Sequence, residues 1–131
     1  YARAETSSAT FEDPRVLKAS STDGVDGFHY PSLDLDEAGN PYLVWELFPN
    51  REVSRSQGLG LIASSNGGRS FGPPEVIPGT LSKKLGFNGG LQGKLTNKID
   101  VEDGRIAVVH SSFNPGEKSR VLLYLGSVKP R

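Results

Sequence analysis

Two groups of residues in this sequence have side-chain types that bind polar ligands or catalyse reactions. The first group places two carboxylates, an imidazole and a phenol within one short stretch: Asp23, Asp26, His29 and Tyr30. The second is an acid and an imidazole, Glu46 and His110, which could bind or catalyse if folding brought them together. The alternatives are an ordinary polar loop for the first group, and satisfaction by neighbouring backbone groups for the second.

The composition and motifs exclude several kinds of chemistry. There is no Cys, which rules out disulfides, thiol catalysis and Cys-ligated metals. No Gly-x-Ser-x-Gly, P-loop or His-Glu-x-x-His motif is present. Asp34-x-Asp36 with Glu37 and Asn40 resembles the start of a calcium loop, but Ala38 replaces the third acid. A solvated hairpin is the better interpretation, and we predict neither a metal site nor a cofactor.

The charge balance argues against nucleic-acid and membrane partners. The 15 Lys+Arg residues offset 15 Asp+Glu residues, so the net charge is zero. No apolar run approaches the roughly 18 residues of a membrane span. The sequence starts at Tyr1 and contains no Met, which predicts a processed or cut chain, and we expect a secreted protein, extracellular or periplasmic.

Turn residues and alternating hydrophobic residues predict an all-β chain. With 16 Gly and 9 Pro, turns are frequent and long helices are disfavoured. Leu33 and Leu35 alternate with acids, which is the period of a half-buried strand. Trp45, among apolar neighbours, is predicted to pack in the core. Four strands are predicted in the first part of the chain, at residues 31–36, 42–48, 58–64 and 75–77.

The second part of the chain repeats this order of strands. Residues 98–102 match residues 32–36, residues 106–110 match 42–46 with a turn two residues shorter, and residues 121–127 match 59–65. The fourth strand of this second repeat is missing at the carboxyl end. Residues 14–17 match residues 74–77 in kind and order, so the missing strand is predicted at the start of the chain.

Repeats of this length with four strands each are typical of propeller blades. We predict a first blade at 21–79, a connecting loop at 80–95, a second blade of three strands at 96–131, and an N-terminal segment, 1–20, whose outer strand completes the second blade. In such a ring, residues 23–30 would line one mouth of the central channel. Residues 83–93 have the composition of a binding loop or a plain linker. The alternative fold is a β-sandwich of about eight strands.

The turn after the third strand, Ser64-Ser65-Asn66-Gly67-Gly68-Arg69-Ser70-Phe71, resembles the Asp-box of sialidase-like propellers, Ser-x-Asp-x-Gly-x-Thr-Trp/Phe. Asn replaces the customary Asp but keeps the acceptor oxygen and tolerates left-handed φ. A partial copy, Thr10-Phe11, precedes the N-terminal strand. The resemblance implies a structural role for Ser64, Asn66, Gly68, Ser70 and Phe71.

Sialidase activity would also need an arginine triad, a Tyr/Glu nucleophile pair and an acid/base Asp. Where the resemblance implies Phe/Tyr-Arg-Ile-Pro, this sequence has Phe28-His29-Tyr30-Pro31, and His cannot form the bidentate clamp of Arg. Glu46 could match a family glutamate, but residues 37–90 contain no Asp. The sequence therefore favours a non-catalytic module. The alternative is a glycoside hydrolase using Glu46 or Asp23 and Asp26, with the remaining catalytic groups from other blades.

Two blades do not close a ring, since propellers use about four to eight. We expect either a homo-oligomer, such as a trimer with six blades, or the remainder of a longer propeller. The expected function is binding of a carbohydrate or a protein, or assembly. Its candidate ligand-binding residues are Asp23, Asp26, His29, Tyr30, Glu46 and His110.

Overall fold

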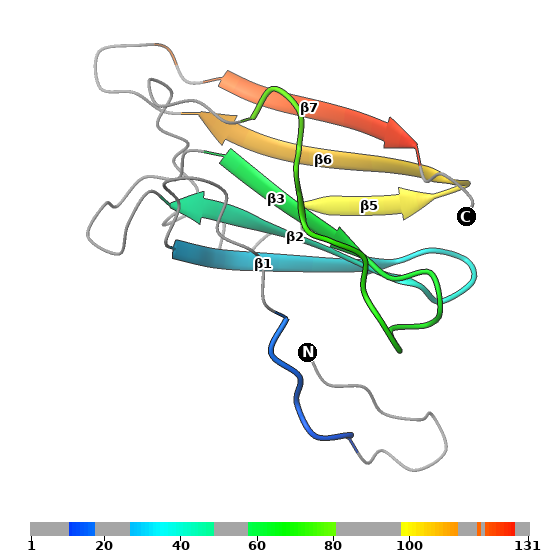
Figure 1. Ribbon diagram of the computed structural model, residues 1–131. Helices are drawn as coiled ribbons and strands as arrows, with labels where there is room; N and C mark the ends of the chain where they lie inside the picture. The colour runs from blue at the N-terminus through cyan, green and yellow to red at the C-terminus, as the bar shows by residue number, and fades with distance from the viewer. Residues whose placement is uncertain are drawn as a thin grey trace.

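The computed structural model describes residues 11–17, 27–48, 58–80, 98–112, 118 and 120–127 as two antiparallel β-sheets (Figure 1). The first sheet has the order β1-β2-β3-β4, and the second has the order β5-β6-β7. The strands are β1 (Gly27–Leu35), β2 (Pro41–Phe48), β3 (Gly58–Ala63), β4 (Glu75–Val76), β5 (Ile99–Glu102), β6 (Arg105–Ser112) and β7 (Arg120–Ser127). The prediction of an all-β chain is confirmed for these residues.

The first strand begins earlier than predicted because it contains a β-bulge. β1 starts at Gly27 instead of Pro31, and its register with β2 shifts between His29 and Ser32. Tyr30 has φ +54°, an unusual value for a bulky residue, and Pro31 has no N–H to donate to the ladder. The bulge interrupts the alternation of side chains, so the pattern in the sequence is regular only after it.

The main core lies between the two sheets. The first sheet contributes Tyr42, Val44 and Leu59, and the second contributes alternate residues of β5 and β6: Ile99, Val101, Ile106 and Val108. Each fully buried Val or Leu side chain stabilises the fold by about 1.5–3 kcal/mol. Since neither sheet can bury these residues alone, the shared core holds the sheets together.

The outer face of the first sheet carries a second apolar cluster. Trp45, Leu47 and Ile62 are buried there, with Phe71 packed against them. The Trp45 ring lies over Gly60 on the neighbouring strand, and a Cβ at residue 60 would stand 2.5 Å from the ring. Only glycine fits beneath this indole, and Trp45 packs in the core as predicted.

Polar side chains from the first repeat satisfy the backbone of β5. Ser32 Oγ accepts the Lys98 N–H (3.3 Å), and Asp34 accepts the Val101 N–H (2.7 Å). Glu37, in the β1–β2 turn, accepts the N–H of Asp103 at the β5–β6 turn. These contacts join β1 to β5 along one edge of the second sheet, where an open strand would otherwise present unpaired N–H groups.

The two repeats stack through opposite faces. Leu33 and Ile99 occupy the same place in their repeats, yet Leu33 is 44% exposed on the outer face of the first sheet, whereas Ile99 is 3% exposed in the core between the sheets. Asp34, which corresponds to Asp100, points inward and binds β5, while Asp100 is exposed. One face of the repeat therefore packs on the opposite face of the next repeat, head to tail.

One detail of the predicted repeat alignment is wrong. The ladders place Leu43 and Val108 in corresponding positions, so the second turn is one residue shorter than the first, and not two. Glu46 was predicted to match His110, but His110 corresponds to Trp45. A slip of one residue moves a side chain to the other face of a strand, so the two residues belong to opposite faces of the repeat.

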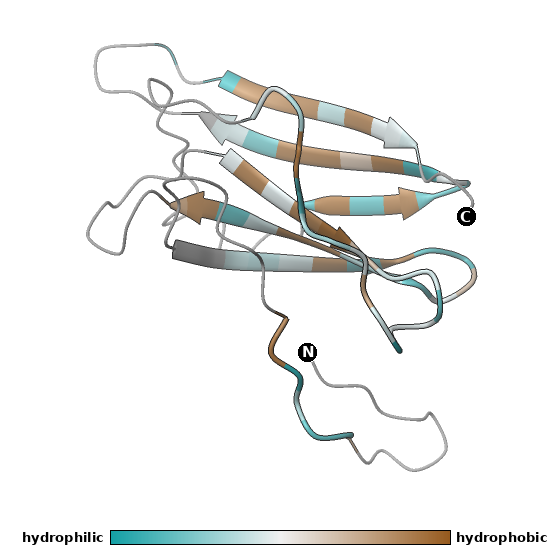
Figure 2. Ribbon diagram, viewed as in Figure 1, coloured by the Kyte–Doolittle hydropathy of each residue, from teal (hydrophilic) through white to brown (hydrophobic). Residues whose placement is uncertain are grey.

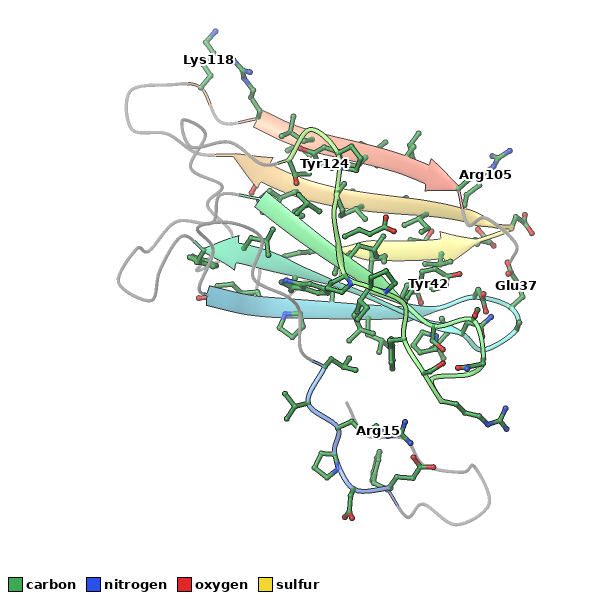
Figure 3. The ribbon with its side chains drawn as sticks, in the orientation of Figure 1. Arg15, Glu37, Tyr42, Arg105, Lys118 and Tyr124 are labelled. Atoms are coloured by element: carbon green, nitrogen blue, oxygen red, sulfur yellow. The ribbon has the colours of Figure 1, made fainter. Side chains whose placement is uncertain are left out.

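Within one chain, residues 12–17 of the predicted N-terminal strand do not pair with the second sheet. Residues 12–17 have no regular secondary structure, and among the described strands β7 pairs only with β6. The Arg15 guanidinium instead donates to the Arg69 carbonyl (2.7 Å), beside the first sheet. Arg15 lies well away from β7 (Figure 3). Pro14 cannot donate to a ladder, and the neighbouring charges favour solvent over a sheet edge.

Candidate functional site

A cluster of ionisable groups lies buried between the two sheets, at the end of the strands remote from the β1–β2 turn. Glu46 projects from the inner face of β2 and has no exposed surface. Lys98, immediately before β5, is 6% exposed, and its ammonium forms an ion pair with Glu46 Oε1. A carboxylate and an ammonium removed from water need such a partner, because an unpaired buried charge is strongly destabilising.

Tyr30 adds a backbone oxygen and an aromatic ring to this cluster. Its carbonyl accepts a hydrogen bond from Lys98 Nζ (3.5 Å), and its ring centroid lies 5.6 Å from the same nitrogen. The ring also packs against Phe48, with 6.3 Å between centroids. The bulge in β1 and the positive φ of Tyr30 accompany this placement. Lys98 is thus surrounded by a carboxylate, a carbonyl and a ring face, all of which attract a cation.

His110 enters the same region from β6. The side chain is 4% exposed, and burial together with the positive charge of Lys98 lowers its pKa from 6.5 to about 4. Burial is the larger cause, because the low-dielectric interior disfavours the charged imidazolium. His110 is therefore neutral at physiological pH.

The chemistry of this cluster is that of a buried structural network. Glu46 is committed to Lys98 and has no exposed surface, so it does not meet a substrate from solvent. A glycosidase needs two carboxyl groups about 5–9 Å apart that flank an open pocket. Among the described residues, only one carboxylate, Glu46, belongs to this buried cluster. The arrangement instead links β2, β1, β5 and β6, which favours one relative position of the two sheets.

The structure brings three of the six candidate ligand-binding residues around one lysine. Glu46, His110 and Tyr30 all approach Lys98, although Glu46 and His110 belong to opposite faces of the repeat. They meet because the sheets stack head to tail, so opposite faces share one interface. His29 is described only as backbone within β1, and Asp23 and Asp26 lie outside the described residues, as do residues 83–93.

Lys98 is the central residue of the cluster, and sequence reasoning missed it. In a regular strand, Lys98 would lie on the same face as Asp100 and Glu102. Both of these residues are exposed, so the alternation predicts a solvated Lys98 side chain. The alternation does not extend to Lys98, because this residue lies just before β5 and its N–H donates to Ser32 Oγ. No signal in the sequence alone identifies this position as buried.

The turn that resembles an Asp-box is held by an internal hydrogen-bond network. Ser64 Oγ accepts the N–H groups of Asn66 (3.2 Å) and Gly68 (2.9 Å). Asn66 Oδ1 accepts the Ser70 N–H (2.9 Å), and Asn66 Nδ2 donates to Ser70 Oγ (2.7 Å). Gly67 and Gly68 have φ of 67° and 82°, which glycine adopts without strain.

This turn is fastened to the neighbouring β1–β2 turn. The Gly67 N–H donates to Asn40 Oδ1 (2.9 Å), and Asn40 Nδ2 donates to Asp36 (2.9 Å). Burial raises the pKa of Asp36, but hydrogen bonds from Asn40, Ala38 and Tyr42 outweigh it and hold this pKa below its ordinary value. Asp36 therefore stays ionised and acts as a cap for its own turn.

A groove of about 760 Å³ lies between these turns and the second sheet. Its polar lining includes hydroxyls and two carboxylates, Asp36 and Glu75, and its aromatic lining is Tyr42 and Phe71. Figure 3 shows Glu37 and Arg105 at this same end of the two sheets. The groove is thus at the opposite end of the strands from the Lys98 cluster.

Neither metal ligation nor a membrane helix is found in the part of the chain that the structure describes. No three His, Cys, Asp or Glu side chains there are grouped to hold an ion. Asp34 is engaged with the Val101 N–H, and Asp36 caps its turn, so these two acids do not converge. Within the same residues no helix is long and apolar enough to cross a membrane.

No family model, curated protein or solved structure matches this chain.

Proposed function

We propose that this chain is a non-catalytic, secreted module built from sialidase-like propeller repeats, and that it acts by binding or assembly. Secretion is part of the proposal, and the assignment to sialidase-like repeats rests on the resemblance of residues 64–71 to an Asp-box. The hydrogen bonds of Ser64, Asn66 and Ser70 inside that turn are compatible with this resemblance.

The observation that carries the proposal is the head-to-tail stacking of the two sheets. In a ring of blades, each sheet covers the next with the same pair of opposite faces. A sandwich of two repeats related by a twofold axis would instead bring equivalent faces together. The exposure of Leu33 and the burial of Ile99, its counterpart, support the first arrangement.

Two features of the described residues support a non-catalytic module. Glu46 is enclosed with Lys98, so the glutamate that could match a sialidase residue is not open to substrate. The segment at residues 28–31 reads Phe-His-Tyr-Pro and lacks the arginine of a carboxylate clamp.

The proposal is tested by incubating the chain with a fluorogenic sialoside and by applying it to a glycan array. We expect no hydrolysis above the rate of a heat-denatured sample, whether or not a glycan binds. Turnover that survives purification and is lost in the Glu46→Gln variant would contradict the proposal and support a glycoside hydrolase.

A further inference from the structure

The outer face of the second sheet carries a contiguous apolar patch. Four large side chains of β6 and β7 lie on it with substantial exposure: Val109 (48%), Leu123 (59%), Leu125 (75%) and Val121 (76%). The ladder pairs Val109 with Leu123 and Ala107 with Leu125, so these side chains are cross-strand neighbours on one face. Hydrophobic bands run along β7 (Figure 2). A patch of this kind on a soluble domain marks an interaction surface.

The equivalent patch of the first repeat is already covered inside the chain. The ladders match Val109 to Val44 and Val121 to Leu59, and both counterparts are fully buried against the second sheet. The covering residues in that interface include Ile99 and Val101 of β5. The chain thus shows which face of a repeat fits this patch.

The β1 edge of the fitting face is also exposed, on the other side of the same chain. Ile99 and Val101 correspond to Leu33 and Leu35, which are 44% and 50% exposed on β1. Phe71 and Val76 pack nearby against the apolar cluster of that outer face. Each chain therefore presents the docking patch on one side and the β1 edge of the fitting face on the other, while the β2 part of that face, at Pro41 and Leu43, is already buried or half-buried.

We propose that the outer face of β6 and β7 in one copy docks on the outer face of β1 in a second copy of this chain, continuing the stacking found within the chain. This inference rests on the proposed function, in which the repeats stack head to tail, and it identifies the binding partner as a second copy of the chain. The contact is heterologous, so repeated docking closes a ring or extends a filament. Asp100, the counterpart of Asp34, would face β1 of the second copy as Asp34 faces β5.

The test uses the solution mass of the whole chain and of three single variants, measured by light scattering after size exclusion. Leu123→Lys places a charge on the docking patch, and Leu35→Lys places one on the fitting face. Val16→Lys is the control, because Val16 is 85% exposed on the N-terminal segment and belongs to neither face. All are surface changes, and fluorescence of the single Trp, Trp45, checks that each variant is folded.

We expect the unaltered chain and Val16→Lys to be oligomers, and Leu123→Lys and Leu35→Lys to drop to the monomer mass of 14.1 kDa. An equimolar mixture of the two monomeric variants should form a dimer, because each retains one intact and complementary face. This recovery is specific to a heterologous interface.

Three results would overturn the inference: a monomeric unaltered chain at about 100 μM, dissociation by Leu123→Lys but not by Leu35→Lys, or no dimer in the mixture. The second result would mean that two identical patches pair. A folded, monomeric chain without sialoside turnover would overturn this docking and leave the non-catalytic proposal standing. Turnover would overturn the proposed function whatever the mass.

Discussion

Lys98 is the central residue of the polar contacts between the two sheets. Its ammonium meets Glu46, the Tyr30 carbonyl and the Tyr30 ring, and its charge helps to lower the pKa of His110. These residues come from different strands or their ends. The contacts of this cluster therefore form only when the two sheets are correctly stacked.

The pKa of His110 predicts a loss of stability in mild acid. The unfolded chain binds a proton near pH 6.5, whereas the folded chain binds it only near pH 4, so the unfolded state holds more protons between these values. The contribution of His110 is therefore complete above pH 6.5 and is lost as the pH falls toward 4, by about 3 kcal/mol in all. Urea unfolding at a series of pH values measures it.

The matched variant is His110→Gln, which should flatten this part of the stability profile. His29→Gln serves as the control, since His29 is the only other histidine of the chain. An unchanged slope in His110→Gln would show that another group causes the acid sensitivity.

Removing one partner of the buried ion pair should cost more than removing both. Lys98→Met leaves the Glu46 carboxylate buried without its ammonium, and we expect a loss of about 3–5 kcal/mol in the free energy of unfolding. The double variant Lys98→Met/Glu46→Leu should recover most of that loss, because no charge remains in the interior. Equal losses in the single and double variants would argue against the pair.

At the scale of elements, turns decide how the strands are joined and oriented. The turn at residues 64–71 closes the β3–β4 connection and is tied to the β1–β2 turn by Asn40. The β5–β6 turn, Asp103-Gly104, has positive φ at both residues, the geometry of a tight two-residue hairpin. The difference of one residue between the β1–β2 and β5–β6 turns sets which face His110 occupies.

Asn66 provides a test of the turn. Asn66→Ala removes the acceptor for the Ser70 N–H and the contact with the Ser70 hydroxyl, and should lower the free energy of unfolding by about 1–2 kcal/mol. Asn66→Asp keeps the acceptor, and the Ser70 hydroxyl can donate to it, so stability should be nearly unchanged. Thermal unfolding of both variants measures this, and a large loss in Asn66→Asp would contradict the assigned network.

At the scale of the whole molecule, the two sheets share one core. Tyr42, Val44 and Leu59 of the first sheet form one cluster with buried side chains of β5 and β6, and Tyr124 of β7 packs against it. Separating the sheets would expose the apolar side chains of both facing surfaces to water, and the free energy gained by burying them would be lost. The sheets should therefore be stable together and not apart.

This predicts a single unfolding transition. Trp45 is the only tryptophan and lies in the first sheet, so its fluorescence follows that sheet, while far-ultraviolet circular dichroism follows all strands. The two signals should give the same denaturant midpoint. Separate midpoints would show that the sheets unfold independently and that the shared core contributes little.

The sequence determined the class of fold and most of the strands, because strand alternation and turn residues act over a few neighbours. It also identified Glu46 and His110 as residues that could act together if folding brought them near one another. Tertiary structure placed both of them beside Lys98. A bulge at Tyr30, the length of one turn and the burial of Lys98 depend on contacts between residues distant in the sequence. The pairing of opposite faces also appears only when the sheets stack, because a repeat pattern is the same whichever face it buries.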